Sequence, residues 1–164
     1  FRSRDADSSR FLNAVIQESE AADAALLALR ELADDGTTAY RFLAKLREAR
    51  LLAQEGDTAQ ALAVFDSVAA DADLGDTYRD LARLLAVANG LDVLSQDEVE
   101  TRIGPLNVAG NPFQVTAREF LAVSAIKAGD TARAEELLRA NQADGSAPVA
   151  SRARATEILT AIGR

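Results

Sequence analysis

The chain has 164 residues, the length of one ordinary domain, and a net charge of −8 at pH 7. This acidity argues against nucleic acid as a partner, because a phosphate backbone would be repelled. The absence of His and Cys removes the commonest general base, the commonest metal ligand and the best nucleophile, so we expect no catalytic site, no metal site and no cofactor.

Residues 8–36 predict two amphipathic helices. The first, residues 8–17, begins with a serine that can serve as its N-cap. Its predicted apolar face consists of Phe11, Leu12, Val15 and Ile16. The second, residues 20–36, carries a stripe of Ala and Leu side chains and stops at Gly36, in the place of a C-terminal glycine.

Residues 37–74 predict a second pair of helices with clearer boundaries. The helix of residues 37–56 ends at Gly56, and Asp57 caps the following helix, with Gln60 at the capping-box spacing. The apolar stripe of the first helix consists of Phe42, Leu43, Leu46, Ala49, Leu52 and Ala53. The apolar side chains of the second are Ala61, Leu62, Val64, Phe65 and Val68.

The rest of the chain predicts five more helices and no strand. They occupy residues 76–90, 95–105, 111–128, 131–142 and 149–162. Ser95 and Glu98 have capping-box spacing, and a Gly-Pro pair cuts that helix short. Asn111 as the cap and Pro112 at the first helical position mark the start of the next helix.

Two stretches of the chain are nearly alike: "EGDTAQALAVF" and "AGDTARAEELL". Their glycines, Gly56 and Gly129, lie 73 residues apart, which is twice a period of about 36 residues. Two helices in a period of this length are typical of an α-solenoid. The sequence therefore predicts one all-α domain, residues 1–164, made of four helical hairpins and a C-terminal capping helix. The hairpins are residues 8–36, 37–74, 75–110 and 111–145, and the capping helix is residues 147–163.

These turns resemble those of the tetratricopeptide repeat (TPR). That family places small residues where its two helices cross and a large apolar residue toward the next hairpin. The matching residues are Ala49, Ala61 and Phe65 in one hairpin and Ala122, Ala134 and Leu138 in the other. The resemblance implies closely crossing helices whose turn residues build the scaffold. The hairpins of residues 8–36 and 75–110 depart from the pattern.

A narrower resemblance covers most of residues 38–141. The segment "AYRFLAKLREARLLAQEGDTAQALAVFDSVAAD", with the later Asn-Pro-Phe helix start and Ala-Gly-Asp turn, looks like the repeat domain of membrane-anchored bacterial proteins akin to the ancillary subunit of the Sec translocon. In that family a membrane helix precedes an Ala-rich periplasmic domain. The resemblance implies the periplasmic side of a bacterial inner membrane, with an anchor upstream of Phe1; a cytoplasmic location stays open.

Grouped carboxylates are the remaining candidates for chemistry. They are Asp34 and Asp35, Asp71 and Asp73, and Asp97 with Glu98 and Glu100. Acidic residues at turns and helix starts are expected in any case, because they complement the helix dipole. We therefore interpret these groups as structural.

Stacked hairpins form a concave surface lined by the first helix of each hairpin, and such a surface suits a peptide or a partner helix. The candidate partner-binding residues are Arg50, Gln54, Tyr78, Asn89 and Lys127. The predicted function is therefore non-catalytic binding of a protein or peptide.

The alternative function is self-association as a homodimer. The closing helix would carry it, because this helix has several apolar side chains on one side. They are Val149, Ala153, Ile158, Leu159 and Ile162.

Overall fold

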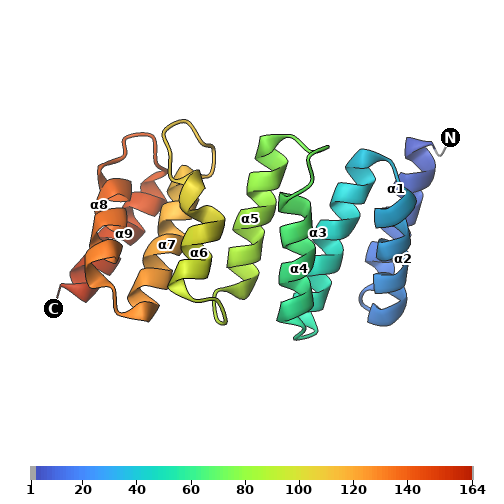
Figure 1. Cartoon of the computed structure of the whole chain (residues 1–164), viewed down its shortest axis with the longest axis horizontal. Helices are drawn as coiled ribbons and strands as arrows, with labels where there is room; N and C mark the ends of the chain where they lie inside the picture. The colour runs from blue at the N-terminus through green and yellow to red at the C-terminus, as the bar shows by residue number, and fades with distance from the viewer. Residues whose placement is uncertain (1–2, 164) are drawn as a thin grey trace. The chain divides into compact units, whose positions relative to one another are not determined.

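The computed structural model describes residues 3–163, and every regular element in that range is helical (Figure 1). The predicted all-α class is therefore confirmed. The elements are α1 (Arg4–Gln17), α2 (Ala22–Asp35), α3 (Thr38–Gln54), α4 (Thr58–Ala69), α5 (Asp76–Gly90), α6 (Gln96–Ile103), the 3-10 turn η1 (Gly104–Leu106), α7 (Gln114–Ala128), α8 (Thr131–Ala143) and α9 (Val149–Ile162).

The helices belong to two compact units, Phe1–Ala82 and Arg83–Arg164, and the division falls inside α5. In the first unit α1 packs on α2, α2 on α3 and α3 on α4. In the second unit α6 packs on α7, α7 on α8 and α8 on α9. Packing of each helix on its neighbours along the chain is the arrangement of an α-solenoid. The organisation as one domain stays a prediction.

Small side chains bring the helices of the first unit close together. The buried cluster across α1, α2 and α3 consists of Ala14, Ala25, Leu29, Leu32, Ala33, Ala44 and Leu51. The predicted apolar face of α1 is wrong in part, because Leu12 and Ile16 are exposed while Ala14 is buried. Helices approach most closely where side chains are small, so α1 packs through the side that carries Ala14.

The two Gly-Asp turns have the same geometry. Gly56 and Gly129 adopt the left-handed conformation, with φ of 88° and 80°. The amide of Asp57 donates a 2.9 Å hydrogen bond to the carbonyl five residues earlier, and the amide of Asp130 donates a 2.8 Å bond in the same way. Each turn is therefore a Schellman motif, which satisfies carbonyls at the end of the preceding helix.

Side-chain caps follow these turns. Asp57 accepts a 3.1 Å bond from the amide three residues on, as predicted, and Asp130 accepts a 3.1 Å bond in the same way. The predicted capping box at Gln60 is not formed: the side-chain amide of Gln60 donates to the carboxylate of Asp57, and the backbone amide of Asp57, which the box would use as its donor, donates to the carbonyl of Leu52 instead. The box at Ser95 and Glu98 is present in full.

Two predicted helix starts are wrong. α1 begins at Arg4, earlier than predicted, and its cap is Ser3, whose hydroxyl accepts a 3.3 Å bond from the amide three residues on. α7 begins at Gln114, later than predicted. The side chain of Asn111 accepts a 2.8 Å bond from the amide two residues on, and this local turn delays the helix.

Gly36 ends α2 by a different mechanism from the one predicted. Its φ of −74° and ψ of 169° are extended rather than left-handed. A Cβ atom at this position would lie 2.6 Å from the carbonyl oxygen of Leu32 and 2.9 Å from its Cδ1. Only glycine, which has no Cβ, lets the backbone at position 36 lie this close to the buried end of α2.

A polar cluster holds the second unit together around Arg118. Its guanidinium donates to Asn107 at 2.8 Å, to Asn141 at 3.4 Å and to Asp144 at 3.0 Å. Asn141 is fully buried and also donates a 2.9 Å bond to the carbonyl of Val115. The cluster ties α7, α8 and the segment after η1 to one another.

Candidate functional site

The first unit has a pocket of about 610 Å³ beside the N-terminal ends of α1, α3 and α5. We name it the α3–α5 pocket. Its apolar wall consists of Phe42, Leu43, Leu74 and Tyr78. Arg4 and Asp73 are the charged groups in its lining. A volume in this range and a mostly apolar wall are typical of sites that bind a small molecule or an anchoring side chain.

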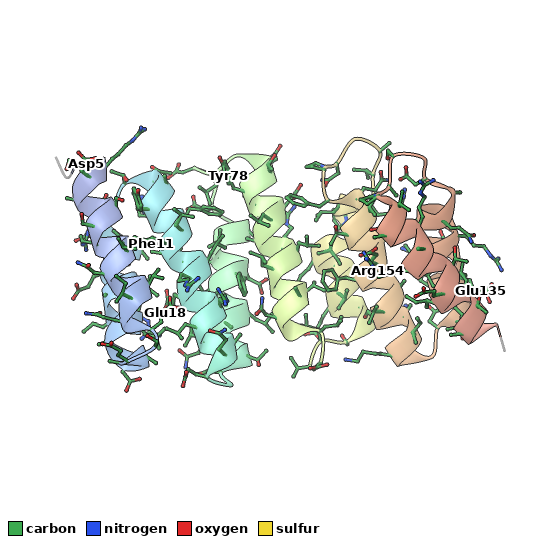
Figure 2. The ribbon with its side chains drawn as sticks, turned by 180° about the vertical axis from the view of Figure 1, so that it is seen from behind. Asp5, Phe11, Glu18, Tyr78, Glu135 and Arg154 are labelled. Carbon is green, nitrogen blue, oxygen red and sulfur yellow. The ribbon has the colours of Figure 1, made fainter. Side chains whose placement is uncertain are left out.

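Tyr78 forms the outer part of the wall. Its side chain lies at the N-terminal end of α5, as Figure 2 shows, and is 54% exposed. Its ring meets the ring of Phe42 edge-on, with centroids 5.1 Å apart and an interplanar angle of 70°. This is a favourable arrangement for two aromatic rings, so Phe42 positions Tyr78 while about half of Tyr78 stays exposed.

The loop between α4 and α5 completes the wall. Asp71 accepts two bonds that shape this loop, a 3.0 Å bond from the amide of Asp73 to its carboxylate and a 3.2 Å bond from the amide of Leu74 to its carbonyl. Gly75 then starts α5 by accepting a 3.0 Å bond from the amide of Tyr78. The local hydrogen bonds thus fix Leu74 next to the aromatic pair.

A buried carboxylate supports the N-terminal end of α3. Asp7 in α1 is fully buried and accepts a 2.8 Å bond from the amide of Thr37 and a 3.3 Å bond from Arg10. The hydrogen bond from Thr37 is the main reason why the pKa of Asp7 lies below its usual 3.8. Arg10 also bonds Asp35 at 2.8 Å, so this network joins α1 to both ends of the α2–α3 connection.

A second, small cavity of about 10 Å³ shares part of the pocket's lining, and we name it the narrow extension. It shares Phe42 and Leu74 with the pocket and is also lined by Arg41 and Lys45. The Nε of Arg41 is buried and has no hydrogen-bond partner within residues 3–163. Cationic groups therefore adjoin the apolar wall.

The structure places the predicted binding residues of the first unit on exposed surface. Tyr78 lines the α3–α5 pocket together with Leu43. Arg50 follows Leu43 by seven residues, about two helical turns, so the two lie on one side of α3. Gln54 is exposed at the last residue of α3. Their role in binding stays a prediction.

The predicted residues of the second unit have partners within that unit. Asn89 is half-buried, and its amide donates a 2.8 Å bond to the carbonyl of Leu85 in the same helix. Lys127 donates to the carbonyl of Leu91 and lies 4.0 Å from the carboxylate of Asp92. Both residues therefore make structural contacts, and their role in binding is untested.

Several residues of the pocket were not among the sequence candidates. Phe42 belongs to the predicted apolar stripe, so nothing in the pattern distinguished it from core. Leu74 lies in a connection without periodicity, and Arg4 precedes the predicted first helix. A sequence signal did exist at Arg41 and Lys45, because α3 is strongly basic in an acidic chain.

No group of three or more potential metal ligands occurs within residues 3–163. None of the helices in the described range combines the length and the apolar character that a membrane span requires. Comparison of the chain with protein-family models, with curated proteins and with solved structures gave no match. The α3–α5 pocket is therefore the feature of the described residues from which a function can be inferred.

Proposed function

We propose that this protein is a non-catalytic scaffold that binds a protein or peptide through the α3–α5 pocket. The observation that carries the proposal is the accessible apolar wall, where Leu43 and Tyr78 are 40% and 54% exposed beside a pocket of about 610 Å³. Exposed aromatic and aliphatic side chains around a concavity are typical anchoring points for a partner's side chain.

The fold supports this function by analogy. Stacked helical hairpins commonly present binding surfaces on their first helices, and the wall residues Leu43 and Tyr78 come from α3 and α5, the first helices of two predicted hairpins. The proposal also retains the TPR-like character of the hairpins and a location on the periplasmic side of a bacterial inner membrane. The Gly-Asp turns and the Ala-rich helix crossings support the first point, and the sequence resemblance over residues 38–141 supports the second.

Selection from a displayed peptide library tests the function. The wild-type protein should enrich a consistent set of peptides, and Leu43→Asp should abolish their binding because it places a carboxylate on the apolar wall. Leu27→Asp is the matched control: Leu27 is 61% exposed on α2 and does not line the pocket. Enrichment that survives Leu43→Asp, or that Leu27→Asp removes equally, would refute binding at this pocket.

Self-association through α9 is the second candidate. Val149 is 74% exposed, and Ile158, Leu159 and Ile162 are only half-buried. Sedimentation over a wide concentration range should then show a dimer, and Leu159→Glu should shift it toward the monomer. A monomer at all concentrations would contradict this candidate.

A further inference from the structure

The helix that borders the α3–α5 pocket has a charge opposite to that of the whole chain. α3 contains Arg41, Lys45, Arg47 and Arg50 against one acidic residue, Glu48, so its net charge is +3 in a chain of −8. Within the described range no other helix exceeds a net charge of +1. A local charge of this kind attracts anionic groups to one surface of an otherwise acidic protein.

Ion pairs inside the first unit account for part of this charge. Arg47 bonds both carboxylate oxygens of Glu18, at 2.5 and 2.7 Å, and Glu48 accepts a 2.7 Å bond from Arg30. Glu48 thus pairs with a residue of α2 and makes no ion pair with a cation of α3 among the described residues. The remaining cations of α3 and the pocket rim have no ion pair of 4.0 Å or less within residues 3–163. They are Arg4, Arg41, Lys45 and Arg50.

Three of these unpaired cations adjoin the apolar wall. Arg41 and Lys45 are four residues apart, so they lie on one side of α3, and both line the narrow extension next to Phe42. Arg4 lies in the lining of the main pocket. Asp73 lines both cavities and Asp71 the extension, so carboxylates oppose some of this positive charge.

We propose that the α3–α5 pocket binds an acidic peptide, with a large apolar side chain of the peptide against Phe42, Leu74 and Tyr78 and its flanking carboxylates toward Arg41, Lys45 and Arg4. The inference rests on the proposed peptide-binding function and adds the chemical class of the ligand. The apolar wall provides the anchor, and the unpaired cations select for acidic flanks. Asp73 repels the same flanks and limits the affinity.

Three fluorescein-labelled short peptides test the ligand class by fluorescence anisotropy. Each has Leu-Phe at its centre, and the flanks are Asp and Glu, Ser and Gly, or Lys and Arg. The acidic peptide should bind most tightly and the basic one most weakly, about tenfold apart at low ionic strength. This difference should shrink as salt is added, because exposed charges are screened.

Single substitutions then assign the charges. Lys45→Gln should weaken binding of the acidic peptide about threefold and leave the neutral peptide unchanged. Arg139→Gln is the matched control, because it removes one positive charge from α8 in the second unit, where Arg139 bonds Glu135 at 2.8 Å. Asp73→Asn should tighten binding of the acidic peptide. Equal effects of Lys45→Gln and Arg139→Gln on the acidic peptide would overturn the charge assignment.

The two tyrosines of the chain allow the site to be located by intrinsic fluorescence. In Tyr40→Phe, Tyr78 is the only tyrosine left in the sequence. Binding of an unlabelled acidic peptide that contains Leu in place of Phe should change its emission. Anisotropy changes without a change in Tyr78 emission would overturn the location.

The remaining outcomes separate the two proposals. Binding of the neutral or basic peptide as tight as that of the acidic one overturns the inference about charge but leaves the peptide-binding function intact. Failure of all three peptides to bind overturns the inference about the acidic peptide, while the library selection decides the peptide-binding function separately.

Discussion

Gly36 and Gly56 end neighbouring helices for different physical reasons, and substitution should separate them. In Gly36→Ala the new Cβ would lie 2.6 Å from the carbonyl oxygen of Leu32, whereas ordinary contacts begin at 3.4 Å. The two atoms would have to move apart by about 0.8 Å to reach an ordinary contact, against a fully buried Leu32. Overpacking of this kind costs about 1–3 kcal/mol, and the lower entropy of the unfolded chain offsets about 0.4–1 kcal/mol of it.

We expect Gly36→Ala to lower the free energy of unfolding by about 1–2 kcal/mol. Each kcal/mol should lower the melting temperature by roughly 2–4 °C. Gly56→Ala meets no atom within 4 Å, but it must hold φ near 88°, which costs about 1–2 kcal/mol before the same offset. The two alanine variants are therefore close in stability, and asparagine is the substitution that distinguishes the positions.

Asparagine adopts the left-handed conformation more readily than alanine, so Gly56→Asn should be more stable than Gly56→Ala. Gly36→Asn should be no more stable than Gly36→Ala, because both carry the clashing Cβ. Urea unfolding followed by circular dichroism measures the four free energies. Wild-type stability for Gly36→Ala, or an equal rescue by asparagine at both positions, would refute the reasoning.

Three further changes probe the two units. The pKa of Asp7 is lowered in the folded state, so its carboxylate contributes its full stabilisation above the ordinary pKa of 3.8 and loses it as the pH falls toward the folded-state pKa. Asp7→Asn should therefore lower the free energy of unfolding at neutral pH and make that free energy depend less on pH in the acid range, as urea unfolding at several pH values would measure. Phe65→Ala should lower the free energy of unfolding by urea by about 3–5 kcal/mol, because Phe65 is fully buried. Leu62→Ala should lower it clearly less, because Leu62 is only half-buried, and equal losses would contradict this difference in packing. Arg118→Ala should lower the free energy of unfolding by about 1–3 kcal/mol, because it leaves the buried Asn141 without one hydrogen-bond partner. A melting temperature equal to that of the wild type would contradict this and show that water replaces the guanidinium.

The local signals in the sequence predicted the helices well. Apolar side chains recurring every three to four residues located them, and the Gly-Asp and Ser-x-x-Glu spacings predicted turns and a capping box that depend on residues within a few positions of one another. The errors arose where a side chain makes a local bond other than the expected one. Asn111 forms a turn instead of a cap, and Gln60 bonds a carboxylate instead of the backbone.

Predicting the candidate site was harder, because the pocket depends on which elements meet in space. Tyr78 was predicted to lie on the binding surface from the repeat spacing, and it lines the α3–α5 pocket beside Leu43, which the sequence pattern assigned to an apolar stripe. Leu74 and Arg4 carry no periodic signal, and only folding brings them to the same pocket. The first helix shows a second difficulty. Its pattern of large apolar side chains predicted that Leu12 and Ile16 face the core, but the helix packs through the side that carries the small residue Ala14.

The Gly-Asp turns also bear on how quickly the chain reaches its folded state. Every hydrogen bond that defines them joins residues no more than five positions apart, as between Asp57 and Leu52. Such contacts close with little loss of loop entropy, and chains rich in local contacts fold fast. Each turn can therefore form before its helices meet their neighbours, so that the two helices of a hairpin arrive at their packing partners already joined in the correct register.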